Sequence, residues 1–128
     1  MDRQTHSSQL GAAFAQHYYS TFDHNIENLG SLYADNAFFS FEGNCVIGPV
    51  DIMNRFRSMG FSQIIHKIFT VDAQPGPVEG THIIFVTGQF AIDGEVDKPH
   101  LFSETFQLAQ QGGSVVIIND IFRRVSQG

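Results

Sequence analysis

Apolar residues in the first part of the chain recur at helical spacing. Leu10, Phe14 and Tyr18 fall four residues apart on one stripe, which predicts an amphipathic helix that begins at Ser8. Residues 1–7 carry no such stripe, and we expect them to be frayed.

Two shorter helices are predicted to follow the first. Asn25 can cap a helix whose apolar face includes Leu29 and Tyr33. A third helix begins at Pro49, because proline at the first helical position loses no hydrogen bond. It ends before Gly60, since glycine is common just past the end of a helix.

After Gly60 the apolar residues alternate with polar ones, which is typical of β-strands. The predicted strands, including a short hairpin before the third helix, are residues 37–42, 45–47, 64–71, 82–92, 101–109 and 115–125. Helices that come first and strands that follow predict an α+β fold, in which about three helices pack on one face of a strongly bent antiparallel sheet. We expect residues 1–128 to form one domain.

Charge and composition exclude several classes of function. The net charge is −6, whereas binding to nucleic acid or an anionic membrane requires clustered Lys and Arg. No apolar run is long enough to cross a bilayer, and no segment is typical of a signal peptide. Cys45 is the one cysteine, so an intramolecular disulfide is impossible, which fits a reducing compartment.

The sequence also lacks the motifs of cofactor and metal sites. The histidines and Cys45 show no paired metal-ligand spacing. No glycine-rich phosphate loop, nucleophile motif or dinucleotide fingerprint is present. We therefore predict no cofactor and no metal.

An acidic hairpin ends the longest apolar run. Phe90 and Ile92 alternate with polar or small residues, and Asp93 and Glu95 then flank the turn residue Gly94. Residues two apart on a strand point the same way, so both acids are expected to face one basic partner. This pattern predicts an apolar hollow with a charged rim that receives another protein.

The chain resembles the nuclear transport factor 2 family from about Gln9 to Val125. The motifs that carry this resemblance are Gln16-His17-Tyr18-Tyr19, Leu29-Gly30-Ser31-Leu32-Tyr33, Phe41-Glu42-Gly43, Thr87-Gly88-Gln89, Phe102-Ser103-Glu104 and Asn119-Asp120-Ile121-Phe122-Arg123. The resemblance implies a cone of helices against a bent sheet, which encloses an apolar pocket and pairs with a second copy through the open sheet face.

The resemblance implies that the chain is a carrier and not an enzyme. Family members bind the small GTPase Ran in its GDP form and take it into the nucleus, with weak contacts to Phe-x-Phe-Gly repeats of nuclear-pore proteins. The chain would thus occur in cytoplasm and nucleus, concentrated at the pores. The family often has an aromatic residue for the repeat contact where this chain has Ser7.

The resemblance also implies the site residues. The carboxylates expected on the Ran-binding rim are Glu42, Asp93 and Glu95. The expected pocket wall consists of Phe41, Met59, Phe61, Ile64, Phe90, Ile92 and Phe122. We expect Ile121 and Glu104 at the dimer interface.

Two other functions are compatible with this fold. An enzyme would need an inward-facing acid or base, for which His66 and Glu104 are the candidates, although we interpret His66 as a satisfied core histidine and Glu104 as an interface carboxylate. The other is an mRNA-export adaptor, in which a similar domain pairs with a larger related chain. Retention of Glu42 and Asp93 favours the Ran carrier.

Overall fold

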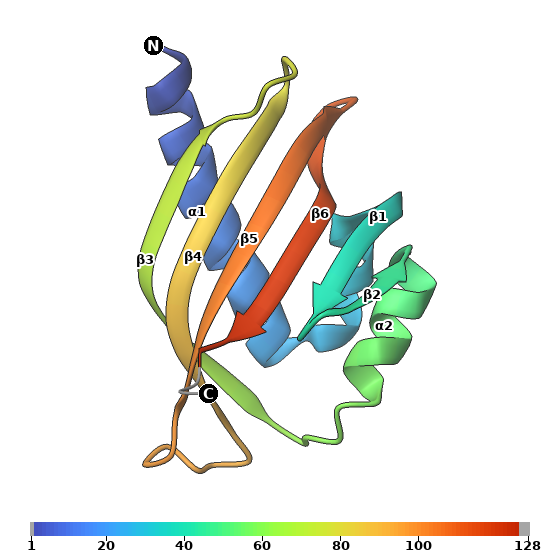
Figure 1. Cartoon of the computed structure of the whole chain (residues 1–128), viewed down its shortest axis with the longest axis vertical. Helices are drawn as coiled ribbons and strands as arrows, with labels where there is room; N and C mark the ends of the chain where they lie inside the picture. The colour runs from blue at the N-terminus through green and yellow to red at the C-terminus, as the bar shows by residue number, and fades with distance from the viewer. Residues whose placement is uncertain (1, 126–128) are drawn as a thin grey trace.

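The computed structural model describes residues 2–125, and its helices lie on one face of a six-stranded sheet (Figure 1). In chain order the elements are α1 Arg3–His24, the 3-10 helix η1 Ile26–Leu32, β1 Tyr33–Phe41, β2 Asn44–Ile47, α2 Pro49–Arg57, β3 Ile64–Pro75, β4 Thr81–Ile92, β5 His100–Gln111 and β6 Ser114–Arg124. The predicted α+β architecture is confirmed. None of the described helices is long and apolar enough to cross a membrane.

The first helix begins earlier than the sequence pattern predicts. The Asp2 carboxylate accepts a hydrogen bond from the Thr5 amide at 2.7 Å, which caps α1 and allows it to begin at Arg3. Ser7 is fully buried, and its hydroxyl lies 2.8 Å from Nδ1 of His82. The expectation of fraying is therefore wrong for residues 3–7, because local capping and a tertiary contact order them.

The strands are connected in the order β2-β1-β6-β5-β4-β3. All neighbouring pairs are antiparallel except β1 and β6, which run parallel, with Phe41 opposite Phe122. The last strand therefore lies inside the sheet, between the hairpin β1–β2 and the meander β3–β5. This pairing is not predicted by the sequence pattern, because it joins segments that are distant along the chain.

Helix α1 packs closely against the edge of the meander. A Cβ atom added to Gly11 would lie 2.5 Å from the Cβ of Ala73 on β3, so only glycine allows this approach. Irregularities of register at Ile68/Thr70 and Gln107/Leu108 interrupt the ladders. Such bulges increase the local twist and bend of a sheet.

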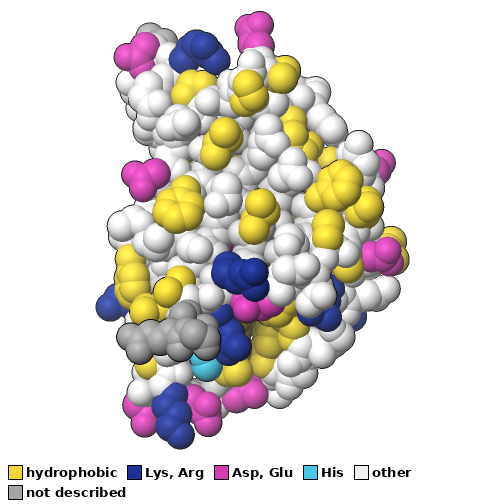
Figure 2. Space-filling model, in the orientation of Figure 1, with side chains coloured by type: hydrophobic (Ala, Val, Ile, Leu, Met, Phe, Trp, Pro, Cys, Tyr) yellow, Lys and Arg dark blue, Asp and Glu magenta, His cyan; other side chains and the backbone are white. Residues whose placement is uncertain are grey.

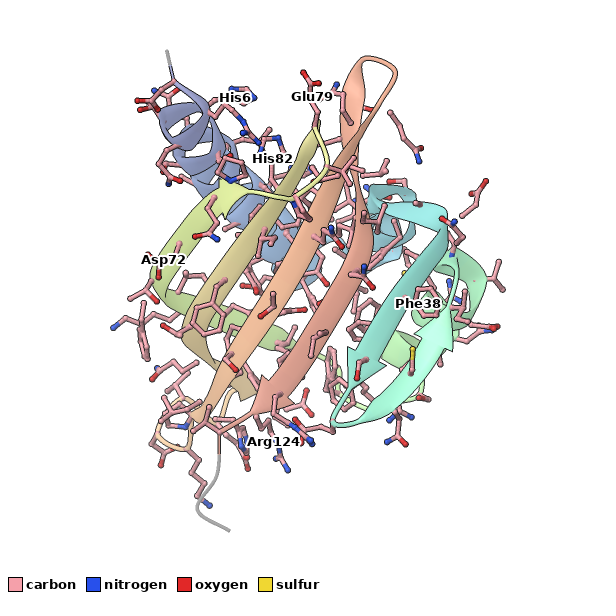
Figure 3. All side chains as sticks on the ribbon, turned by 45° about the horizontal axis from the view of Figure 1, so that its top comes forward. His6, Phe38, Asp72, Glu79, His82 and Arg124 are labelled. Carbon is pink, nitrogen blue, oxygen red and sulfur yellow. The ribbon has the colours of Figure 1, made fainter. Side chains whose placement is uncertain are left out.

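The other face of the sheet is not covered by helices. Figure 1 looks onto this open face, with α1 passing behind the strands, and Figure 2 shows apolar side chains spread across it. Strand alternation places Phe38, Phe85 and Ile121 on this side, where they are 49%, 42% and 55% exposed. Figure 3 shows Phe38 on β1 among the side chains of this region.

Candidate functional site

An apolar pocket with a volume of about 370 Å³ opens between α2 and the sheet. It lies where β1, β4 and β6 end, so three strand ends and the segment after α2 form its wall. The predicted wall residues that line this pocket are Phe41, Met59, Phe61, Ile64, Phe90, Ile92 and Phe122. All of the wall residues that we predicted are thus brought together in one cavity.

Aromatic side chains build the inner wall. The rings of Phe41 and Phe122 are stacked, with centroids 5.1 Å apart and an interplanar angle of 4°. Phe122 also packs against Phe90 and Phe102, with centroid distances of 6.1 Å and 5.5 Å. Offset contacts of this kind stabilise pairs of rings beyond the effect of their burial. The wall is therefore held in shape by ring-on-ring packing.

Glu42 is the one predicted rim acid that lines the pocket. It has a left-handed backbone conformation with φ 51°, and its Oε1 accepts a hydrogen bond from the Arg124 amide. Its Oε2 lies 3.9 Å from Nη1 of Arg123, and its side chain is 28% exposed. The carboxylate is thus fixed at the pocket mouth and remains accessible.

Asp93 has a different place from the one predicted. Its Oδ1 accepts hydrogen bonds from the amides of Ser62 at 2.8 Å and Gln63 at 2.9 Å, which fastens the segment after α2 to the end of β4. Strand β4 ends at Ile92, and Asp93 has φ 52°, so the alternation of a strand does not continue to Glu95. The prediction that both acids share a strand face is therefore wrong. Glu95 is exposed, and neither acid belongs to the pocket lining.

Two arginines that the sequence analysis missed also line the pocket, Arg55 on α2 and Arg124 on β6. The guanidinium carbon of Arg55 lies 5.2 Å from the centroid of the Phe41 ring. No motif marks these residues. The spacing of α2 predicts its apolar face but not which charged residue borders it.

Glu104 faces the interior rather than a dimer partner. Its position on β5 places it on the same side as Phe102 and Phe106, where it is 4% exposed and lines the pocket. Tyr19 on α1 donates a hydrogen bond to its Oε1 at 2.7 Å. Our expectation of Glu104 at the dimer interface is therefore wrong, because strand parity places it under α1.

Beside Glu104 lies a second buried acid, Asp120 on β6. The Tyr33 hydroxyl donates to Oδ2 of Asp120 at 2.6 Å, and the Tyr18 hydroxyl lies 2.7 Å from that of Tyr33. Among the described groups Oδ1 of Asp120 has no hydrogen-bond partner, although it is buried. A proton on Glu104 can supply the missing donor, because a neutral carboxyl group donates one hydrogen bond.

Burial makes both acids easier to protonate. It raises the pKa of Glu104 well above its usual value, and the neighbouring Asp120 carboxylate raises it further. Burial also raises the pKa of Asp120, to about 6, against the lowering effect of the nearby Glu104 carboxyl group and the hydroxyls of Tyr33 and Tyr18. The carboxyl pair therefore retains a proton to higher pH in the folded chain than in the unfolded chain.

His66, the other candidate for catalysis, is satisfied within the protein. Its Nδ1 lies 2.6 Å from Oδ1 of Asp23, and its amide donates to Oδ2 of the same carboxylate at 2.9 Å. This agrees with our interpretation of a core histidine. The described residues contain no group of His, Cys, Asp or Glu that could hold a metal ion.

The comparisons with known proteins agree with this architecture. The family model described as "Nuclear transport factor 2 (NTF2) domain" matches residues 10–124. The nuclear transport factor 2 of Oryza sativa is 41% identical over 114 residues, which cover 89% of this chain and 93% of that protein. The one from Kluyveromyces lactis is 37% identical over 116 residues, covering 91% and 92% respectively.

Solved structures also match over nearly the whole chain. The structure of nuclear transport factor 2 from Cryptosporidium parvum has a TM-score of 0.88 at 37% identity and covers 98% of this chain and 99% of that one. A putative scytalone dehydratase from Novosphingobium aromaticivorans, with a TM-score of 0.76 at 12% identity over 90% and 81% of the two chains, shares the fold alone. The chain therefore belongs to the nuclear transport factor 2 family and is not an enzyme.

Proposed function

We propose that this chain is a homodimeric carrier that binds the GDP form of Ran and imports it through nuclear pores. The names of its relatives support a role in transport between cytoplasm and nucleus. The observation that carries the proposal is an open aromatic pocket with the accessible carboxylate of Glu42 at its mouth. An aromatic side chain of the partner enters this pocket, and basic residues next to it meet the acids outside.

The free energy of this interaction comes chiefly from burial of the partner's aromatic side chain in the pocket. Burial of one phenylalanine side chain contributes about 1.5–3 kcal/mol. An exposed ion pair contributes only about 0–1 kcal/mol. The acids therefore act mainly on orientation and on the rate of encounter.

The three acids have different parts in this proposal. Glu42 meets a basic group directly, since it is fixed at the mouth and accessible. Asp93 acts indirectly, because its carboxylate accepts hydrogen bonds from the amides of Ser62 and Gln63 and so holds the segment that forms part of the pocket wall. Glu95 is exposed and contributes long-range attraction.

The open sheet face is the surface on which we propose that two copies pair. Its exposed Phe38, Phe85 and Ile121 provide the apolar area that a stable dimer buries. We place the weak contact with Phe-x-Phe-Gly repeats elsewhere than at Ser7, because that side chain is fully buried and bonded to His82.

Calorimetry with Ran loaded with GDP or with GTP tests the proposal. We expect binding to Ran·GDP alone, because the switch segments of a GTPase differ between the two states. Glu42→Gln keeps an acceptor for the Arg124 amide but removes the charge, so it should weaken binding roughly twofold to fivefold.

Glu79→Gln is the matched control for this measurement. Glu79 lies in the turn between β3 and β4, at the end of the molecule away from Arg124 (Figure 3). It should bind Ran·GDP as the parent does. Absence of binding to either form of Ran would overturn the proposed function, and equal affinity of Glu42→Gln and parent would remove Glu42 from the interface.

A heterodimeric export adaptor is the second candidate. The Candida albicans Mtr2–Mex67 M domain complex contains a chain with a TM-score of 0.75 at 16% identity, a likeness that shows the fold alone. The same open apolar face would serve either kind of pairing. A stable homodimer of the purified chain in sedimentation analysis would favour the Ran carrier.

A further inference from the structure

The pocket mouth has a charge opposite to that of the whole chain. The chain carries a net charge of −6, yet the charged groups near the mouth are Arg55, Arg124 and the single carboxylate of Glu42. That carboxylate already accepts a hydrogen bond from the Arg124 amide and lies near Arg123. The opening therefore has uncompensated positive charge on Arg55.

Arg55 differs in this respect from the other arginine on the same helix. Arg57 donates to Oε1 of Glu27 at 2.6 Å and to Oδ1 of Asn54 at 3.2 Å. In the described part of the chain Arg55 makes no such side-chain bond, and its Nε is buried without a partner. A buried donor without an acceptor is costly, and a ligand that supplies an acceptor removes that cost.

The groups around Arg55 restrict the chemistry of such a ligand. The guanidinium lies over the Phe41 ring at 5.2 Å, and Phe41 is stacked on Phe122. A flat ring can extend this stack into the cavity, while a carboxylate matches the planar fork of a guanidinium. The volume of about 370 Å³ is within the range of small-molecule sites.

We propose that this pocket binds a small aromatic carboxylate, with its ring against Phe41, Phe90 and Phe122 and its carboxylate on Arg55. The ligand is a free molecule and not a protein side chain, since the cavity can enclose a whole two-ring compound. Such a compound occupies the space that the aromatic side chain of a protein partner would need. It would thereby act as a competitor of that partner.

The acids around the pocket do not oppose this anion strongly. Asp93 and Glu95 lie outside the lining. Glu104 lines the pocket, but burial next to Asp120 raises its pKa, which favours its neutral form. Glu42 is the one lining acid with an accessible charge, and it is held by the Arg124 amide.

Two probes of the same shape separate the charge from the ring. We would titrate ¹⁵N-labelled protein with 2-naphthoate and, in parallel, with neutral 2-naphthalenemethanol, and follow backbone amide shifts. Naphthoate should shift the amides of Phe41, Ile92 and Phe122 saturably and bind about tenfold more tightly than the alcohol.

Arg55→Gln and Arg57→Gln are the matched variants. Arg55→Gln should reduce the affinity for naphthoate to that for the alcohol and leave the alcohol unchanged. Arg57→Gln should alter neither affinity, since Arg57 is exposed and is paired with Glu27. Arg57 is exposed, whereas Arg55 is half-buried with its guanidinium over the Phe41 ring. Glutamine keeps a polar group and part of the aliphatic stem at either position, so both variants should fold.

Several results would overturn the proposal. They are an absence of saturable shifts with naphthoate, shifts confined to other parts of the chain, equal affinities of the two probes for the parent, and unchanged naphthoate binding in Arg55→Gln. The measurement contains no Ran, so it is decided independently of the proposed carrier function.

Discussion

At the scale of single residues, the most unusual feature is the pair of buried carboxyl groups on β5 and β6. Glu104 and Asp120 are 4% and 1% exposed, and the groups that contact them are tyrosine hydroxyls rather than cations. Acids buried without a positive partner favour protonation. Folding therefore shifts the protonation equilibria of both acids to higher pH than in the unfolded chain.

Glu104→Gln should reduce the pH dependence of stability. Both pKa values are raised on folding, that of Asp120 to about 6, so the folded chain binds more protons than the unfolded chain. Stability should be highest below about pH 4 for these groups and should fall as pH rises through 6. An amide at position 104 can accept from Tyr19 and donate to Asp120 without ionising, so urea unfolding at pH 8 should show a more stable variant with a flatter profile.

The control for this experiment is Glu79→Gln, an exposed acid that should leave the profile unchanged. Other titratable groups contact the pair. Burial raises the pKa values of Tyr18, Tyr19 and Tyr33 well above 10, so they stay neutral in this range. A variant with the same slope as the parent would contradict the assignment.

At the scale of elements, two close contacts fix the position of α1 on the sheet. Gly11 lies against Ala73 of β3, and the hydroxyl of Ser7 reaches His82 of β4. The helix spacing in the sequence predicts the stripe that includes Leu10, Phe14 and Tyr18. It does not show how near the helix comes to the strands, because a glycine on a helix is also compatible with a solvent-facing position.

Gly11→Ala should destabilise the fold although alanine favours helices. The added methyl group would lie 2.5 Å from the Ala73 Cβ, and overpacking of this kind costs about 1–3 kcal/mol. The gain in helix propensity is at most about 1 kcal/mol. Gly113→Ala is the control, since a Cβ there meets nothing within 4 Å. If thermal unfolding gave Gly11→Ala the Tm of the parent or higher, α1 would not pack as described.

The pocket residues also divide into those that could be predicted from the sequence and those that only the packing of the elements reveals. The resemblance to the family predicts the pocket wall, and Phe90, Ile92 and Phe122 all line the pocket. The sequence pattern misjudges Asp93, because the left-handed residue before the turn glycine ends the alternation, and only tertiary contacts to Ser62 and Gln63 fix where its carboxylate points. It misses Arg55, because whether a charged residue beside the apolar face of a helix lines a pocket depends on which strands pack opposite that helix.

At the scale of the whole molecule, one face of the sheet builds the pocket and the other is free for assembly. Phe85 and Ile121 are exposed on the free face. Figure 2 shows apolar side chains spread over that face. Exposed apolar surfaces of this kind are typical of protein interfaces. In the proposed carrier function, the pocket receives Ran and the free face pairs with a second copy of the chain.

Ile121→Glu should convert the proposed dimer to a monomer. In a twofold dimer the same patch occurs on both copies, so one substitution introduces two buried charges. Val78→Glu, in the turn between β3 and β4, changes an equally exposed apolar residue outside the face and should leave the dimer intact. Sedimentation velocity distinguishes the two forms, and a dimeric Ile121→Glu would remove this residue from the interface.

The internal position of β6 has a consequence for synthesis on the ribosome. The hairpin β1–β2 and the meander β3–β5 are made first, yet within the sheet they are joined by hydrogen bonds only through β6. Phe122 on that strand also completes the aromatic wall. A nascent chain therefore cannot close its cavity until residues 114–124 have emerged, and a product stopped before residue 114 would expose both halves of its core at once.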